Sequence, residues 1–326
     1  MFYNLHKYVV SIAKVFQTFA SHLIRNSAVN KPIVIGTRGS DLALWQANFV
    51  KSELERLGHS VELVIIKTTG DQIQHLSFDK IEGKGFFTKE IEEALLKKEV
   101  DLAVHSHKDL ETHQPEGLVI AAVSARADAS DVLLVLKSCI DSKQRWSLKS
   151  NANVGTSSSR RKALMRHFRP DVTLTDIRGN VPTRVEKLRS GQFDAILMAK
   201  AGIDRLKLDL SDLHMEVLAP EDFVPAPAQG VLGLQCREED QHIREILSNL
   251  NHPEVATRIQ IERTVLQKME GGCHLPLGVY AVEDDGEFTV NVAYAQQWDQ
   301  PMRALTFISD DAAGLPDLIL KEIKPA

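Results

Sequence analysis

The sequence predicts an α/β protein of three domains: two similar α/β lobes and a small α+β domain at the C-terminal end. Its 326 residues are enough for two or three domains of about 100–200 residues each. Strand and helix patterns alternate from residue 32 onward, which is typical of α/β domains with largely parallel sheets. A strand followed by glycine, threonine, serine and a helix occurs twice, once from Val34 and once from Asn153, which indicates two lobes that begin alike.

The N-terminal half is expected to start with an apolar strand and an amphipathic helix. Gly58 follows this helix as its C-cap, because glycine readily adopts the left-handed backbone that ends many helices. The next run is rich in β-branched residues, as strands are. We predict strands at residues 32–36, 61–67, 100–105, 118–123 and 132–136, and helices at residues 41–57 and 88–98.

The elements that follow repeat the alternation. Pro170 ends one helix, because proline cannot continue a helix, and Gly191 caps another. We predict helices at residues 160–168 and 182–189, and strands at residues 173–177 and 195–199. In the tail we predict a helix at residues 254–269 and strands at residues 279–282 and 288–293.

Two segments of loop composition separate the lobes. They are residues 124–130 and the proline- and alanine-rich residues 219–230. If both join the same two lobes, the chain crosses between them twice and the second lobe is inserted in the first. The expected domains are an N-terminal extension at 1–30, a first lobe at 31–126 and 225–248, a second lobe at 127–224 and a third domain at 251–326.

The first thirty residues contain no aspartate or glutamate and place apolar residues at helical spacing. Lys14, Gln17 and His22 make this stretch too polar to span a bilayer, and it lacks a clear signal-peptide cleavage site. A dispensable extension, an organelle presequence and an interfacial helix therefore all remain open.

Charge and cysteine content narrow the class of protein. The net charge of −5 favours neither nucleic acid nor a membrane as partner. The three cysteines, Cys139, Cys236 and Cys273, cannot form a closed disulfide framework, so a reducing, cytoplasmic compartment is expected. Residues 156–189 nevertheless hold nine lysines and arginines against three acids, which suggests a small anionic ligand, although a solvated helix face has the same composition.

Two predicted helices begin beside arginines. Arg160 and Arg161 lie in the first turn of one helix, where serines cap the backbone. Arg178 and Arg184 flank the start of another, whose N-cap is Asn180. Positive side chains oppose the helix dipole at an N-terminus, and a bound carboxylate or phosphate would relieve that cost. We interpret these arginines as an anion site, with surface arginines as the alternative.

A polar cluster, His105 to Asp109, follows an apolar strand, and open α/β sheets bind ligands at the carboxyl ends of their strands. Asp109 beside Lys108 can act as an acid, a base or a stabiliser of positive charge. The histidine spacing matches no strong metal template, so no metal is expected. The glycine loop around Lys84 is not a Walker motif.

Cys273 follows two glycines, which allow a ligand to approach the backbone closely. Its thiol could be a nucleophile or a point of attachment, and an ordinary loop cysteine is the alternative.

Taken together, seven segments resemble the hydroxymethylbilane synthase (porphobilinogen deaminase) family. The resemblance runs from about residue 31 to about residue 295, and the segments are GTRGSDLALWQ, GKGFFTKEIE, DLAVHSHKDL, GTSSSRR, RGNVPTR, QGVLGLQCR and MEGGCHLPLG. It implies two lobes like those of periplasmic binding proteins and a third domain with the cofactor cysteine. It also implies a monomer that binds neither nucleic acid nor membrane.

The resemblance implies a role for each candidate site residue. Cys273 would hold a dipyrromethane through a thioether, and Asp109 would be the catalytic carboxylate. The residues implied in binding cofactor and substrate are Arg38, Ser40, Lys84, Phe87, Lys108, Thr156, Ser158, Arg160, Arg161, Arg178, Arg184 and Arg205.

The implied activity joins four porphobilinogen molecules head to tail on the dipyrromethane primer, in porphyrin and haem biosynthesis. Loss of ammonia from porphobilinogen leaves positive charge on pyrrole nitrogen, which a carboxylate in the cleft would stabilise. Each ring brings two carboxylates, so many arginines are required. A non-catalytic module that binds or senses small anions is the alternative. Some positions depart from the family pattern, among them His107, Leu110, Glu111 and Pro182, which puts loop conformation and rate in question.

Overall fold

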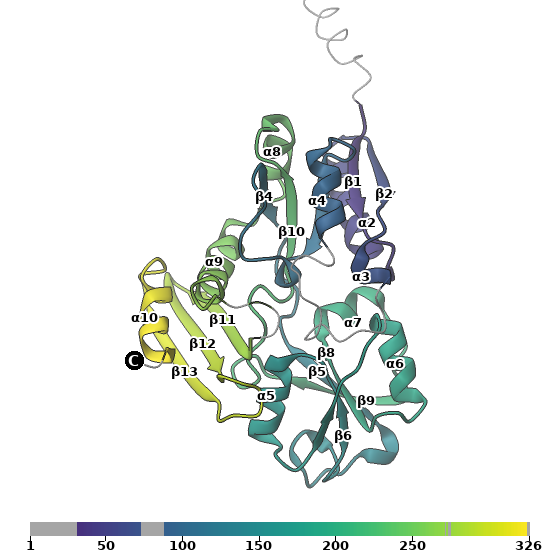
Figure 1. Ribbon diagram of the computed structural model, residues 1–326, viewed down its shortest axis with the longest axis vertical. Helices are drawn as coiled ribbons and strands as arrows, with labels where there is room; N and C mark the ends of the chain where they lie inside the picture. Colours follow the sequence, from purple (N-terminus) through teal and green to yellow (C-terminus); the bar gives the residue numbers. More distant parts are fainter. Residues whose placement is uncertain (1–30, 73–87, 271, 273–274, 325–326) are drawn as a thin grey trace, which may run out of the picture.

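The computed structural model describes residues 31–72, 88–270, 272 and 275–324, and it contains three sheets (Figure 1). The first lobe has the strand order β2-β1-β3-β10-β4. Its strands are β1 Ile33–Thr37, β2 Val61–Ile65, β3 Leu102–Ser106, β4 Leu118–Val123 and β10 Leu232–Arg237. Its helices are α2 Asp41–Arg56, α3 Thr69–Gln72, α4 Lys89–Leu96 and α8 Gln241–Ser248.

The second lobe has the strand order β7-β6-β8-β5-β9. Its strands are β5 Asp131–Leu136, β6 Asn153–Gly155, β7 Thr173–Thr175, β8 Ala195–Ala199 and β9 Leu213–Leu218. Its helices are α5 Ser159–Phe168, α6 Val181–Arg189 and α7 Lys200–Leu206. Short 3₁₀ turns lie at Lys137–Cys139 and Arg145–Ser147, and a third, His107–Asp109, follows β3 of the first lobe.

The two lobes share one topology, which confirms the internal similarity predicted from the sequence. In each lobe one strand has a parallel neighbour on either side: β1 lies between β2 and β3, and β6 lies between β7 and β8. The sheets are mixed, however, and the expectation of largely parallel sheets is wrong in this respect. The strand that follows each crossing between lobes, β5 or β10, runs antiparallel to both of its neighbours.

The two connections between the lobes lie side by side and are hydrogen-bonded to each other. Ala127 N donates to Gly230 O at 3.1 Å, and Ser124 N donates to Leu232 O at 3.0 Å. Arg126 Nε donates to Gln229 O at 3.0 Å. This pairing makes a compact, ordered crossing.

A third domain completes the fold (Figure 1). It consists of α9 Pro253–Lys268, an antiparallel sheet of β11 Leu277–Asp284, β12 Glu287–Tyr294 and β13 Arg303–Ser309, and α10 Leu315–Ile323. Val265, Val290 and Ile319 are fully buried in its core. Ala293 also packs with Phe223 of the second lobe, so this domain is seated on the body of the protein. The predicted fold class, two α/β lobes and a small α+β domain, is confirmed.

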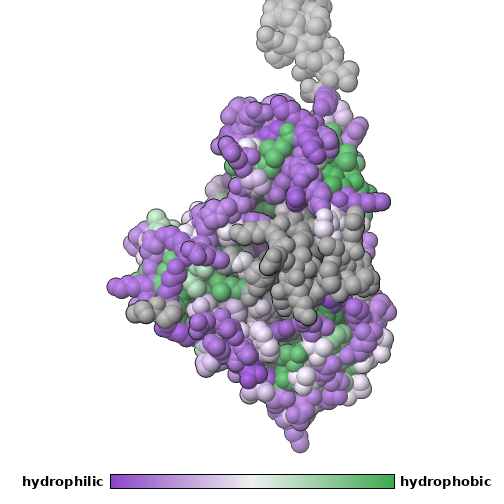
Figure 2. Space-filling model, viewed as in Figure 1, coloured by the Kyte–Doolittle hydropathy of each residue, from purple (hydrophilic) through white to green (hydrophobic). Residues whose placement is uncertain are grey.

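Local sequence explains where the helices of the two lobes begin. Ser40, Ser158 and Asn180 are N-caps whose side chains accept hydrogen bonds from Ala43 N, Arg161 N and Thr183 N. The predicted caps Gly58 and Gly191 adopt positive φ angles of 90° and 76°. Figure 2 shows that hydrophilic side chains cover much of this face of the molecule, with hydrophobic areas between them.

Three sets of expectations fall outside the described residues. They are the N-terminal extension at residues 1–30, most of the glycine loop before Thr88, and the predicted attachment residue Cys273. Within the described part of the chain, no helix is both long and apolar enough to cross a membrane.

The paired connections generate a prediction about Gly230. Its φ is +90°, and an added Cβ would lie 2.5 Å from Ala127 O, so alanine cannot fit without breaking the pairing. We expect Gly230→Ala to lower the free energy of unfolding by about 2–3 kcal/mol. Gly191→Ala is the control, because Gly191 has a φ of +76° with open space around it. Equal losses in urea unfolding of the two variants would contradict the prediction.

Candidate functional site

The site begins at the carboxyl ends of the strands of the first lobe. β1 and β3 are parallel neighbours, so the segments after them meet at one edge of the sheet. Gln46 of α2 donates to Ser106 Oγ at the end of β3 at 2.8 Å, which ties the two segments together. Directly after β3, the 3₁₀ turn His107–Asp109 presents Lys108 and Asp109. Asp109 is exposed and accepts no hydrogen bond from a described residue.

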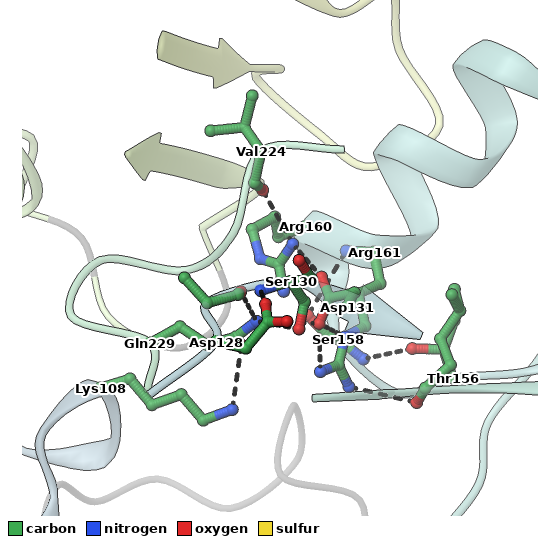
Figure 3. Close-up of polar contacts among 12 residues, drawn as sticks. Lys108, Asp128, Ser130, Asp131, Thr156, Ser158, Arg160, Arg161, Val224 and Gln229 are labelled. Carbon is green, nitrogen blue, oxygen red and sulfur yellow. Dashed lines mark hydrogen bonds and ion pairs between the residues drawn. The ribbon is translucent and has the colours of Figure 1, made fainter. Parts of the chain in front are cut away.

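The second lobe contributes two buried arginines that share one buried aspartate (Figure 3). Arg160 Nη1 donates to Asp131 Oδ2 at 2.7 Å. Arg161 donates to Asp131 Oδ1 through Nη2 at 2.7 Å and through Nε at 3.1 Å. Arg160 also donates to Val224 O at 2.9 Å, and Arg161 to Leu197 O at 3.2 Å. Asp131 begins β5, so this sheet fixes both guanidinium groups.

Asp131 is fully buried, with 0% of its surface exposed, yet it stays ionised. Burial by itself raises the pKa of a carboxyl group. The charges and hydrogen bonds of Arg160 and Arg161 outweigh burial and hold the pKa of Asp131 well below its ordinary value. For Arg160, burial is the larger influence and lowers the pKa of its guanidinium, partly offset by Asp131. The guanidinium groups of Arg160 and Arg161 carry two positive charges, and Asp131 supplies one negative charge between them.

Gln229 joins the two halves of the site. Its Nε2 donates to Asp131 Oδ1 at 3.0 Å and to Ala129 O at 2.7 Å, and its Oε1 accepts from Lys108 Nζ at 3.1 Å. Figure 3 shows Lys108, Gln229 and Asp131 in sequence across the boundary between the lobes. Burial lowers the pKa of Lys108 to about 8, with Asp109 acting in the opposite direction and Arg161 lowering it further. Lys108 and Asp109 are thus electrostatically coupled to the arginines of the opposite lobe.

The second arginine pair lies at the start of α6. Gly179, with a φ of +116°, precedes the N-cap Asn180, and Arg184 Nε donates to Gly179 O at 2.7 Å. Burial lowers the pKa of Arg184 to about 10, helped by the charges of Arg161 and Arg178 and opposed by Asp109. Arg178, Arg184 and Arg161 are therefore close enough to repel one another.

The predicted hydroxyl ligands lie at the helix starts. Ser40 and Ser158 are N-caps, so their oxygens accept backbone hydrogen bonds at 3.4 Å. Thr156 is buried, and its hydroxyl accepts from Ser158 N at 3.3 Å. Each hydroxyl keeps its proton to donate to an anion.

Two further predicted arginines lie on other segments. Arg38 is half-buried and follows β1 directly. Arg205 of α7 donates to Gly230 O at 2.8 Å, and its guanidinium lies over the ring of Trp45, 5.6 Å from the ring centroid. Burial lowers the pKa of Arg205 to about 10. Its observed contacts join α7 to α2 and to the second connection between the lobes.

The structure does not describe three predicted site residues. Lys84, Phe87 and Cys273 lie outside the described residues. The histidines near Asp109 have different partners. His105 is hydrogen-bonded to Gln235 at 3.0 Å, and His113 is hydrogen-bonded to Gln267 at 3.1 Å. Among the described residues, no group of three histidines, cysteines or acids is placed to hold a metal ion.

Sequence reasoning missed Asp131 and Gln229. Asp131 is an acid at the start of an otherwise apolar strand, and such a residue needs a partner when it is buried. That signal was available in the sequence. Gln229 lies in a segment with the composition of a linker, and no local sequence pattern predicts that its side chain connects Lys108 to Asp131.

The donor set suits a ligand with several carboxylates. Among the described residues, Asp109 and Asp131 are the acids whose charges act on Lys108, Arg160 and Arg184. Arg160 Nε is buried and has no hydrogen-bond partner among the described residues. A buried donor without a partner costs free energy, which an added carboxylate can recover.

Two protein-family models match this chain. Residues 33–245 match the family described as "Porphobilinogen deaminase, dipyromethane cofactor binding domain", and residues 256–295 match "Porphobilinogen deaminase, C-terminal domain". The porphobilinogen deaminase of Chloroherpeton thalassium is 44% identical over 265 residues, which are 80% of this chain and 82% of that protein. The porphobilinogen deaminase of Nitratidesulfovibrio vulgaris strain DP4 is 46% identical over 265 residues, with the same coverage. Among solved structures, the periplasmic VFT2 domain of Bordetella pertussis BvgS is 12% identical and covers 74% of this chain and 97% of that one, with a TM-score of 0.41.

The arginine–aspartate cluster predicts a large effect of Asp131→Asn on stability. The amide leaves two buried guanidinium groups without their carboxylate, and breaking such a pair costs about 3–5 kcal/mol. Because the folded pKa of Asp131 is depressed, its contribution is present at neutral pH and is lost as pH falls below the ordinary range of aspartate. We therefore expect unfolding free energies of wild type and variant to differ at pH 7 and to converge in acid.

Asp128→Asn is the matched control, since Asp128 is nearby but exposed and its ion pair with Lys200 spans 3.6 Å. That change should cost at most about 1 kcal/mol. A difference between wild type and Asp131→Asn that does not depend on pH would contradict the assignment of the charge.

Proposed function

This chain belongs to the porphobilinogen deaminase family, and we propose that Asp109 is its catalytic carboxylate and that the surrounding basic cluster binds the carboxylates of primer and substrate. The activity is that of a hydroxymethylbilane synthase, a transferase that joins four porphobilinogen molecules into a linear tetrapyrrole on a dipyrromethane primer. The alternative of a binding module without catalysis is not favoured by this membership.

The described residues fit the primer. Two pyrrole rings bring four carboxylates. Among the described residues, the cluster offers Lys108, Arg160, Arg161 and Arg184 against Asp109 and Asp131, and the buried Nε of Arg160 has no hydrogen-bond partner. Arg160 and Arg161 would hold the primer, with Ser158 and Thr156 as hydroxyl donors. The dipyrromethane supplies the free pyrrole carbon to which the first substrate ring is joined.

The exposure of Asp109 is the observation that carries its assignment. Its carboxylate accepts no hydrogen bond from a described residue, and the neighbouring Lys108 donates instead to Gln229. Asp109 therefore does not serve simply as the ion-pair partner of Lys108. A free carboxylate can stabilise positive charge on a pyrrole nitrogen. It can also pass a proton to the departing amine and accept the proton lost when a new ring regains aromaticity.

The arginines divide by their place in the cluster. Arg160 and Arg161 are the most buried, which supports a role in assembling the primer. Arg184 lies farther out, coupled to Asp109 and Arg178, which supports a role in elongation. Arg38 and Arg205 complete the proposed set, and the contacts of Arg205 with Trp45 and Gly230 suit a residue that acts where the lobes meet.

Further features of the protein remain proposals. We infer that the first lobe comprises residues 31–126 and 225–248, the second 127–224 and the third domain 251–326, which agrees with the strands in each sheet. We also propose a cytoplasmic monomer that acts on porphobilinogen and binds neither nucleic acid nor membrane. The acidic net charge and the small number of cysteines support this proposal.

The primer attachment predicts a covalent adduct on Cys273. Cys273 follows Gly271 and Gly272 and lies outside the described residues, and its assignment rests on family membership. Protein from a host that makes porphobilinogen should carry the mass of a dipyrromethane on the peptide containing Cys273. Cys139 and Cys236 are buried free thiols and serve as internal controls. An adduct on either of them, or unmodified Cys273 in active protein, would refute the assignment.

The catalytic assignment predicts that Asp109→Asn folds and keeps the primer but adds rings far more slowly. Asparagine keeps the size but supplies neither the negative charge nor the proton acceptor. We expect single-turnover ring addition to fall by about 10²–10³-fold or more. Asp109→Glu should be milder, because the charge is kept and displaced by one methylene.

Glu116→Gln is the control for that experiment, since Glu116 is an exposed carboxylate on the same connection between β3 and β4. It should turn over within about twofold of wild type, because exposed charges far from the reacting atoms contribute little. If folded Asp109→Asn adds rings near the wild-type rate, another group is the catalytic carboxylate.

A further inference from the structure

Helix α9 of the third domain reaches the turn that carries Asp109. Arg263 lies near the middle of this helix and is 9% exposed. Its Nη1 donates to Leu110 O at 2.9 Å and to His107 O at 3.4 Å, and its Nη2 donates to Glu111 O. One guanidinium thus holds backbone carbonyls on both sides of Asp109.

These hydrogen bonds from Arg263 add to a small number of backbone hydrogen bonds that hold the turn. Within the turn, Leu110 N donates to His107 O at 3.2 Å, and His107 N donates to Val231 O at 2.9 Å. The C-terminal carbonyls of a 3₁₀ turn need donors from elsewhere. A planar guanidinium can reach several carbonyls at once, whereas an ammonium group is a single point of donation. Arginine is therefore matched to this position.

The helix that carries Arg263 is itself fixed to the first lobe. His252 N, at its N-cap, donates to Val123 O at 3.1 Å, and Asn251 Oδ1 accepts from Val123 N at 3.0 Å. Next to Arg263, the buried Glu262 pairs with Arg126 at 2.6 Å. Arg263 is therefore a rigidly mounted anchor rather than a mobile surface side chain.

We propose that Arg263 is a positioning residue for the reaction: by holding the backbone on both sides of Asp109, it fixes where the Asp109 carboxylate lies. This inference rests on the proposed role of Asp109. Arg263 does not touch substrate in the proposal, and its effect on rate passes through the orientation of Asp109. Displacement of a catalytic group by about 1 Å can cost about 10²-fold in rate.

The experiment uses the full-length, primer-loaded protein with Arg263→Met and Arg263→Lys, each made alone and combined with Asp109→Asn. Intact mass establishes primer content, and single-turnover ring addition, kcat and KM are measured for each variant. We expect Arg263→Met to lower kcat about 10- to 100-fold with KM changed less than about threefold. Arg263→Lys, which keeps the charge but not the fork, should lose at least about fivefold.

The combined variants separate positioning from a general structural role. If Arg263 acts through Asp109, Arg263→Met should slow the Asp109→Asn protein by less than about threefold, because the group it positions is already lost. Equal losses in both backgrounds would overturn the proposal. So would wild-type kcat in folded Arg263→Lys, which is the deciding variant if Arg263→Met does not fold.

Arg258→Met is the matched control. Arg258 lies on the same helix, and its Nε donates to Glu254 O of that helix at 3.1 Å. The Arg258→Met substitution removes one positive charge from the same helix without changing any contact to the turn, and it should leave kcat within about twofold of wild type. The Asp109→Asn protein alone tests the proposed catalytic role: if it is nearly as active as wild type, that role fails, whereas additive losses in the combined variant count against Arg263 only.

Discussion

The buried carboxylate of Asp131 is the interaction on which the cluster of basic residues depends. Two arginines cannot be held side by side in a protein interior unless a negative charge separates them, because desolvation and mutual repulsion both disfavour their charged forms. Asp131 accepts from Arg160, Arg161 and Gln229, so its oxygens are well satisfied. β5 follows directly from the crossing between the lobes, which places this carboxylate at the boundary between them.

A second buried acid, Glu262, organises the crossing itself. It accepts from Arg126 of the first connection, from Ala228 N of the second at 2.6 Å and from Ala281 N of β11 at 2.9 Å. Two connections and the third domain therefore meet on one carboxylate of α9. Removing the partner of such a buried charge is strongly destabilising, which favours a fixed geometry at this junction. Since Arg263 follows Glu262, the same helix links this junction to the turn of Asp109.

Much of the fold could be predicted because local patterns and packing agree. The apolar run at residues 195–199 became β8, and Ser158 caps α5 as its position before the arginines predicts. The antiparallel placement of β10 could not be predicted, since it depends on the chain returning to the first lobe after more than the length of a whole lobe. For the site, arginines opposing a helix dipole indicated an anion, yet part of the answer is the protein's own Asp131. Its partners come from distant segments, and only tertiary structure brings them together.

Burial and the repulsion between positive charges both disfavour the charged forms of the basic cluster. Burial and neighbouring charges lower the pKa of Lys108 to about 8 and that of Arg184 to about 10. Both shifts mean that the charged forms cost free energy in the protein without ligand. Carboxylates bound among these groups would offset that cost, so each bound ring would favour the protonated state of Lys108. Ligand binding, protonation and stability would thereby be linked, and the charge that opposes folding of the free protein is the charge that we propose holds the growing chain.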